Sequence, residues 1–142
     1  MLPSVIETPA PDTIEIVVVG AHLTGQPLNH ELTSVGGHFV EAMRTTAEYR
    51  LFALANTLPP KPGLIREPGF AGPGIEIEVW ALPAAAFGRF VAAIPAPLGV
   101  GKIKLTNGRD VSGFLCESNA LNGAQDITSF GGWRAYRASL AT

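Results

Sequence analysis

Glycine and proline interrupt this sequence so often that no long regular segment can form. The 142 residues include 16 glycines and 12 prolines, and neither residue is favoured inside a helix or a central strand. The segments between them are short, which favours many short strands joined by loops. Hydrophobic residues make up 46% of the chain and charged residues 15%, so enough apolar side chains remain for the core of one domain.

Apolar, mostly β-branched residues at positions 14–19 give the clearest strand signal, and Gly20 ends it. Because almost the whole run is apolar, we expect this strand to be buried on both faces. A second strand is predicted at 75–82, where Glu76 and Glu78 alternate with apolar residues. The dipeptide Asn107-Gly108 predicts a hairpin turn. Further strands are predicted at residues 38–46, 49–54, 64–66, 102–105 and 111–116.

Helical patterns are confined to three short segments. Residues 28–35 contain enough helix formers for two turns, and two glycines follow them. Residues 83–94 predict an amphipathic helix with Pro83 at its first position. Residues 133–140 predict a short terminal helix. Together the elements predict an α+β domain, a small mixed or antiparallel β-barrel with short flanking helices.

Composition also limits the expected location and partners. Residues 1–12 contain three prolines and little periodicity, so we expect a flexible tail or linker, followed by a single domain at 13–142. A net charge of −2 without a basic cluster argues against nucleic acid as a partner. The apolar runs are too short to span a membrane, and no secretory signal is visible. The single cysteine, Cys116, fits a reducing compartment, so we expect a cytoplasmic protein.

One histidine, His22, lies in the turn that follows the first predicted strand. A turn of small residues exposes backbone N–H groups, which can line a site for an anion. An imidazole at such a turn can exchange a proton near neutral pH. The alternative interpretation is that His22 only stabilises the loop.

The sequence lacks the common cofactor and metal motifs. Residues 20–25 have neither the lysine of a nucleotide-binding loop nor the spacing of a dinucleotide-binding motif. The three histidines are spaced by eight residues, and Cys116 is far from all of them, so no metal site is predicted. Cys116 itself is interpreted as a buried apolar residue. We therefore expect no cofactor.

Several charged and aromatic residues have two interpretations each. Glu76 and Glu78 share one face of their strand. They are substrate-binding or basic groups if that face points inward, and solvated charges if it points outward. The cations Lys61, Arg66 and Arg134 could meet an anionic ligand or lie at the surface. The segment that ends at Trp133 either closes over a pocket or attaches the C-terminus to the core.

Several segments, in a consistent order between residues 14 and 140, resemble the C-terminal domain of allophanate hydrolase. The most distinctive is GAQDITSFGGWRAY at residues 123–136. The others are VGAHLTGQPLN at 19–29, YRLFAL at 49–54, PKPG at 60–63, IEVWAL at 77–82, FVAAIPAPLG at 90–99 and GFLCE at 113–117.

The resemblance implies a fold like that of the γ-glutamyl cyclotransferases, with a substrate cavity beside the turn after the first strand. In those enzymes this turn reads Tyr-Gly-Ser-Leu, whereas here residues 20–23 read GAHL. The cyclotransferases also carry a catalytic glutamate after a following helix, but residues 92–98 contain no acid. The resemblance therefore argues against cyclotransferase activity.

The resemblance also implies an activity in urea degradation. In allophanate hydrolase an amidase domain deaminates allophanate, and the C-terminal domain is associated with decarboxylation of the resulting N-carboxycarbamate through a histidine. The matching histidine is His22, which would act as the proton donor to a small carboxylated substrate. The expected substrate-binding residues are Gly20, Ala21, Leu23, Asn29, Lys61, Arg66 and Glu78.

Two alternative functions remain open from the sequence. The first is a non-catalytic module that assembles or stabilises a larger amidase, and the second is an enzyme like the γ-glutamyl cyclotransferases. An amidase domain or subunit and a second copy of the chain are the macromolecular partners that we consider.

Overall fold

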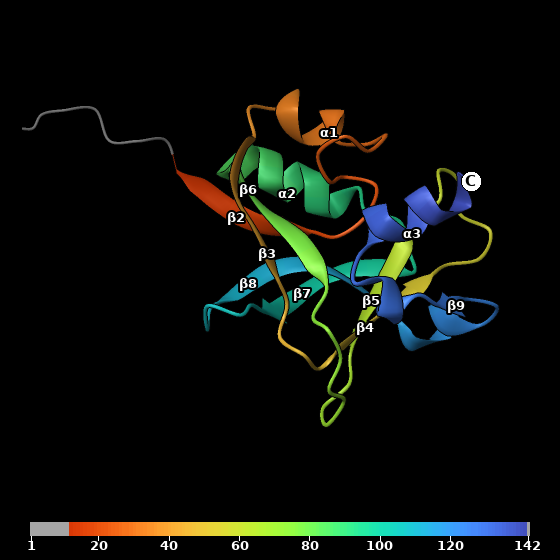
Figure 1. The fold of residues 1–142 in the computed structure, drawn as a ribbon. Coiled ribbons are helices and arrows are strands. Elements are labelled where there is room, and N and C mark those ends of the chain that lie inside the picture. The colour runs from red at the N-terminus through yellow and green to blue at the C-terminus, as the bar shows by residue number, and fades with distance from the viewer. Residues whose placement is uncertain (1–11, 142) are drawn as a thin grey trace, which may run out of the picture.

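The computed structural model describes residues 12–141 as two small sheets with short helices around them (Figure 1). The strands are β2 (Thr13–Val18), β3 (His38–Arg44), β4 (Tyr49–Ala53), β5 (Pro62–Arg66), β6 (Glu76–Pro83), β7 (Leu98–Lys104), β8 (Asp110–Cys116) and β9 (Gln125–Asp126). The α-helices are α1 (His30–Thr33), α2 (Ala84–Ala92) and α3 (Trp133–Leu140), and two 3₁₀ turns span Ser118–Leu121 and Thr128–Phe130.

Strand β2 occupies the centre of the larger sheet, whose order is β3-β6-β2-β8-β7. It runs antiparallel to β6 and parallel to β8. Ile16, Val17 and Val18 are fully buried, as their apolar run predicts for a central strand. Val17 pairs with Gly113, where a Cβ atom would lie 2.6 Å from the Cβ of Val17. Only glycine allows β8 to approach β2 this closely.

The predicted α+β class with short flanking helices is confirmed, but the barrel is open. Strands β5, β4 and β9 form a second sheet, with β5 packed against β8. The hairpin at Asn107-Gly108 is also confirmed, since Gly108 has a φ of 89° between β7 and β8.

Several predicted boundaries differ from the structure, and three of these differences have a clear physical reason. Only His30–Thr33 of the predicted helix 28–35 is helical, because the N–H of Leu28 closes a turn on the carbonyl of Ala21 at 2.8 Å. Pro83 is the last residue of β6 and the N-cap of α2, with a ψ of 141°, instead of the first helical residue. Strand β7 begins at Leu98, four residues before the predicted start, since it pairs with β8 along its whole length.

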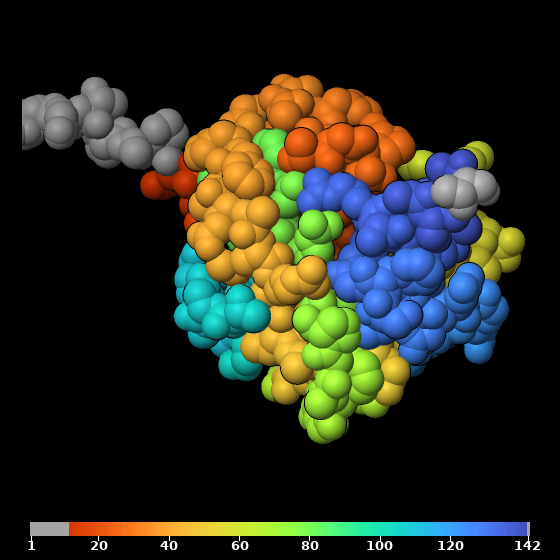
Figure 2. All heavy atoms as spheres, in the orientation of Figure 1, coloured from red at the N-terminus to blue at the C-terminus, as the bar shows by residue number. Residues whose placement is uncertain are grey.

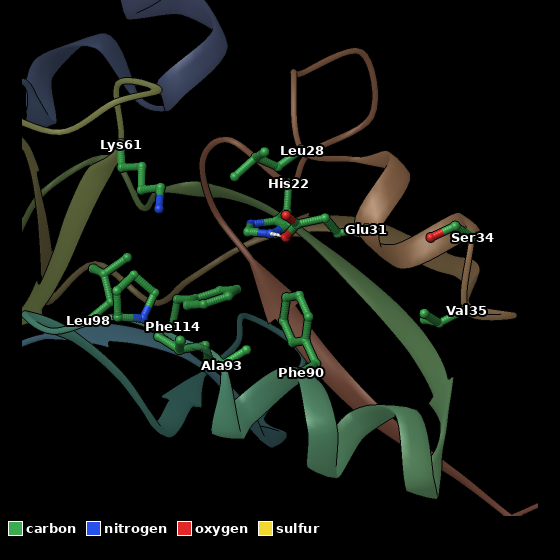
Figure 3. Close-up of a pocket in the computed structure, with 12 residues that line it drawn as sticks. His22, Leu28, Glu31, Ser34, Val35, Lys61, Phe90, Ala93, Leu98 and Phe114 are labelled. Carbon is green, nitrogen blue, oxygen red and sulfur yellow. Dashed lines mark hydrogen bonds and ion pairs between the residues drawn. The ribbon is translucent and has the colours of Figure 1, made fainter.

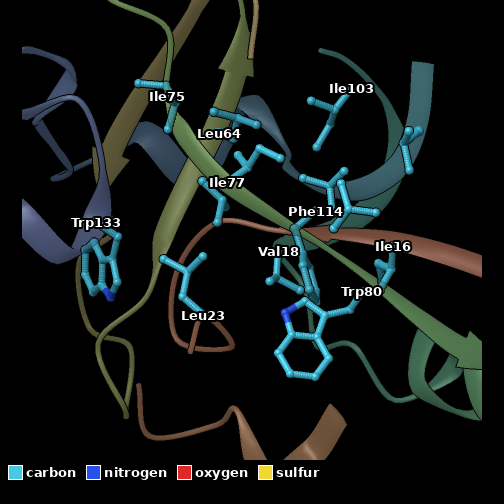
Figure 4. Packing of buried hydrophobic residues seen from close by; sticks show 14 of the residues in the cluster. Ile16, Val18, Leu23, Leu64, Ile75, Ile77, Trp80, Ile103, Phe114 and Trp133 are labelled. Atoms are coloured by element: carbon cyan, nitrogen blue, oxygen red, sulfur yellow. The ribbon is translucent and has the colours of Figure 1, made fainter. Parts of the chain in front are cut away.

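The core lies between the sheets and under α3. Figure 4 shows side chains from both sheets meeting around Leu23, Leu64 and Ile77. Trp133 is only 2% exposed and belongs to this core. It therefore attaches the C-terminal helix to the domain, which is one of the two interpretations of its segment.

The expected tail at 1–12 lies outside the described residues except for Asp12. The carbonyl of Asp12 accepts a hydrogen bond from the N–H of Ala84, at 3.1 Å. Within residues 12–141, none of the helices has the length and apolar character needed to cross a membrane.

Candidate functional site

A cavity of about 350 Å³ opens beside the turn that follows β2 (Figure 3). The turn contributes His22, the end of α2 contributes Phe90, and β8 contributes Phe114. Lys61, which precedes β5, extends its ammonium group into the same space. The remaining lining residues are Leu28, Glu31, Ser34, Val35, Ala93, Ile94, Pro95 and Leu98.

The imidazole of His22 is held on three sides. Its Nε2 lies 2.8 Å from Oε1 of Glu31, which belongs to α1. Its ring stacks on Phe114, with ring centres 5.3 Å apart and planes at 14°. The ring of Phe90 packs edge-on against it at 5.1 Å. The His22 side chain is only 13% exposed, so its orientation is fixed and mostly shielded from water.

Burial lowers the pKa of His22 below its ordinary value of 6.5. The hydrogen bond and the negative charge of Glu31 oppose this effect, whereas the positive charge of Lys61 adds to it. The imidazole is therefore mostly neutral at pH 7. In this form Nε2–H donates to the Glu31 carboxylate, and Nδ1 carries the free lone pair.

The lowered pKa of His22 predicts a pH-dependent stability. The folded state binds the His22 proton less well than the unfolded state does. The contribution of neutral His22 to the free energy of unfolding is therefore complete above about pH 6.5 and is lost as the pH falls below that value. Urea unfolding between pH 7.5 and 5.5 should show this decline, and His22→Gln should flatten it. An equal decline in both proteins would contradict the assignment.

The backbone of the His22 turn is braced by local hydrogen bonds. The N–H of Leu23 donates to the carbonyl of Gly20 at 3.0 Å. The side-chain amide of Asn29 donates to the carbonyl of His22 at 2.8 Å. The N–H of Leu23 and the amide of Asn29, both expected at the substrate, thus already have partners in the turn. The side chain of Leu23 is fully buried in the core.

Gly20 allows the turn to pass close to β5. A Cβ atom at this position would lie 2.2 Å from Cδ of Pro62, a rigid ring that cannot turn away. The same close approach brings Lys61 beside the turn, and Gly20, Ala21, His22 and Lys61 line one narrow recess next to the cavity.

We therefore expect Gly20→Ala to destabilise the domain by about 1–3 kcal/mol, since the added methyl must displace Pro62. Gly88→Ala in α2 is the matched control, because a Cβ atom there meets nothing within 4 Å. In a helix interior this control should be neutral or slightly stabilising. Chemical unfolding of both variants measures the difference, and equal stabilities would contradict the steric argument.

The remaining predicted site residues lie away from the cavity. Arg66 is at the end of β5 and pairs with Glu48. Glu78 is 3% exposed, and both of its carboxylate oxygens are occupied by protein donors. The structure thus brings Gly20, Ala21, His22 and Lys61 together, but neither Arg66 nor Glu78 lines the cavity.

Three residues around His22 were not predicted as site residues. Phe90 was interpreted only as part of the apolar face of a helix. Nothing in the sequence distinguished Phe114 from the other apolar residues of its strand. Glu31 follows His22 by nine residues, a spacing that matches neither helix nor strand periodicity. In the described part of the chain, no three His, Cys, Asp or Glu side chains gather closely enough to hold a metal ion.

Comparison with known proteins gives these features a family context. Residues 14–138 match the model of the allophanate hydrolase C-terminal domain. The urea amidolyase of Saccharomyces cerevisiae is 41% identical over 127 residues, which cover 87% of this chain and 7% of that protein. The allophanate hydrolase of Kluyveromyces lactis has a TM-score of 0.86 and 37% identity, covering 91% of this chain and 22% of that one.

The length of the match differs among the relatives. The chain spans only a small part of urea amidolyase and allophanate hydrolase. By contrast, a protein described as specific to uropathogenic E. coli is matched over 97% of its chain and 89% of this one, with a TM-score of 0.81 and 37% identity.

A γ-glutamyl cyclotransferase shares the fold, with a TM-score of 0.55 and 10% identity. This likeness confirms the predicted fold type and carries no conclusion about activity. The family model covers most of the chain, and relatives at about 40% identity agree with it. The chain belongs to the allophanate hydrolase C-terminal domain family.

Proposed function

We propose that this domain decarboxylates N-carboxycarbamate and that His22 supplies the proton. The observation that supports this best is the enclosure of His22 between Phe90 and Phe114 in a cavity that also receives the ammonium group of Lys61. A single imidazole fixed in orientation beside a cation suits a small anion that must be protonated.

The reaction needs one proton and no cofactor. N-carboxycarbamate carries two carboxylates on one nitrogen. Cleavage of one C–N bond releases carbon dioxide, and the electron pair of that bond stays on nitrogen, which takes the proton. The second product is carbamate, so the overall change consumes one proton from the imidazolium of His22.

The electrostatics of the cavity suit this proton transfer. Free His22 has a lowered pKa, which makes its imidazolium a stronger acid than usual. A bound dianion favours the charged imidazole, so substrate binding itself promotes protonation of His22. Lys61 would balance the second negative charge, and the apolar walls strengthen both interactions by excluding water. An amidase domain or subunit that releases N-carboxycarbamate is the partner that this reaction requires.

Carbon dioxide release tests the proposal directly. Freshly generated N-carboxycarbamate should lose carbon dioxide faster with the purified domain than in buffer, in proportion to protein concentration. The substrate decays spontaneously, so the buffer rate is measured in parallel in the same rapid-mixing apparatus. Identical rates with and without protein would refute the proposed function.

A further inference from the structure

We propose that Arg134 and Glu78, which lie outside the lining of the cavity, are positioning residues that fix the turn carrying His22. The inference rests on the proposed function, because positioning matters for a group that delivers a proton. It concerns residues that do not touch the cavity at all and that connect the C-terminal helix to the site.

Glu78 holds the turn through Thr24, two residues after His22. Its Oε1 accepts hydrogen bonds from both the backbone N–H and the hydroxyl of Thr24, each at 2.9 Å. The same oxygen accepts the indole N–H of Trp80 at 3.0 Å. Glu78 belongs to β6 and pairs with Val18 of β2. The Glu78 carboxylate therefore links Thr24, at the end of the turn, to β6. Strand β6 pairs with the end of β2, where the turn begins.

Arg134 completes this arrangement from α3. Its Nη1 donates to the carbonyl of Thr24 at 3.0 Å and to Oε2 of Glu78 at 3.1 Å. Its Nε donates to Glu76 at 3.2 Å. Figure 2 shows the atoms of α3 lying directly against the segment that follows the turn. The buried ring of Trp133 holds α3 against the core, so the backbone position of the adjacent Arg134 is fixed.

The backbone of the turn is held at His22 and at the two residues that follow it. Asn29 holds the carbonyl of His22, and the core holds the side chain of Leu23. Glu78 and Arg134 then hold both the N–H and the carbonyl of Thr24. Freeing Thr24 would let the turn rotate, and the imidazole would lose its stacked position on Phe114.

Stabilisation alone does not account for the arrangement of this network around Thr24. An ion pair in which one partner is partly exposed, as Arg134 is, contributes little net stability. Beyond packing, the hydrogen bonds from Glu78 and Arg134 fix the orientation of Thr24, because each bond holds one polar atom of that residue. Directional fixing is what a group that transfers a proton needs, since misplacement by about 1 Å can reduce a rate 100-fold.

The test compares Arg134→Met with Arg137→Met, which removes an exposed arginine from the same helix. For Arg134→Met we expect kcat for carbon dioxide release to fall at least tenfold, while KM changes less than threefold. The NMR titration of the His22 ring should move up towards 6.5, and its contacts with the Phe114 ring should weaken. Arg137→Met should match the wild type, and Arg134→Lys should lie between.

Two outcomes would overturn the positioning role. One is an Arg134→Met variant that melts at a lower temperature yet keeps the wild-type kcat and His22 titration at 10 °C. The other is equal behaviour of the two arginine variants. If Arg134→Met does not fold, Thr24→Val removes one bond to Glu78 and should still lower kcat about threefold. If the wild-type domain gives no rate acceleration, the proposed function fails, whereas the His22 titration still decides the positioning role.

Discussion

His22→Asn is expected to reduce protein-dependent carbon dioxide release from N-carboxycarbamate by about 100-fold or more, the usual range for loss of a general acid. Asparagine keeps a polar group that can contact Glu31, but it cannot deliver a proton at neutral pH. The loss should therefore appear in kcat, since Lys61 remains available to bind the substrate. The measurement is the initial rate of carbon dioxide release after subtraction of the buffer rate.

The control for this variant is His38→Asn, which changes an exposed histidine of β3 outside the cavity. It should retain the wild-type rate. Circular dichroism and a melting curve would establish that His22→Asn is folded. A folded His22→Asn protein with more than half of the wild-type rate would exclude His22 as the proton donor.

Glu78→Leu should produce the largest loss of stability, about 3–5 kcal/mol in the free energy of unfolding. Leucine has a similar volume but accepts no hydrogen bond. The substitution would leave the N–H and hydroxyl of Thr24, the indole N–H of Trp80 and one contact of Arg134 without their acceptor. The loss of one acceptor shared by four donors, among them the indole N–H of the buried Trp80, accounts for this magnitude.

Glu76→Leu is the matched control for Glu78→Leu. Glu76 also contacts Arg134, at 3.2 Å, but its side chain is 38% exposed, so water can replace the lost contact. We expect a change below about 1 kcal/mol, as is usual for exposed ion pairs. Urea unfolding at pH 7 compares the two variants. Destabilisation by Glu78→Leu of less than about 1 kcal/mol would contradict the predicted contribution of these hydrogen bonds to stability.

The pKa of Glu78 agrees with its position in this network. Burial alone would raise that pKa. Hydrogen bonds from Trp80 and Thr24 and the positive charge of Arg134 outweigh burial and lower it. Glu78 therefore stays ionised in the folded protein, and its contribution to stability is lost only as the pH falls below the ordinary range of a glutamate.

Local patterns predicted the strands because a buried strand and a hairpin leave a signal in adjacent residues. The run at 14–19 and the dipeptide Asn107-Gly108 were sufficient for β2 and for the β7–β8 turn. The alternation at 75–79 identified β6, but it could not decide whether Glu78 faces solvent or the protein. That choice depends on Thr24 and Arg134, which are 54 and 56 residues away along the chain.

The candidate site was predictable only in part for the same reason. His22 stood out because a strand, a small-residue turn and a titratable side chain follow one another directly. Its partners Glu31, Phe90 and Phe114 come from three separate elements, and only tertiary packing brings them together. Arg66 and Lys61 were both interpreted as cations that could meet an anionic ligand. Lys61 precedes β5 and lines the cavity, whereas Arg66 lies at the other end of β5 and pairs with Glu48.

The most direct test of a proton-delivering dianion site is an NMR titration of the His22 ring with and without malonate. Malonate has two carboxylates on one central atom, as N-carboxycarbamate has, but it is stable in solution. We predict that free His22 titrates below 6.5 and that saturating malonate raises this value, with resonance shifts at Lys61 and Phe114. An unchanged His22 titration, or shifts confined to residues outside the cavity, would contradict a dianion site at His22.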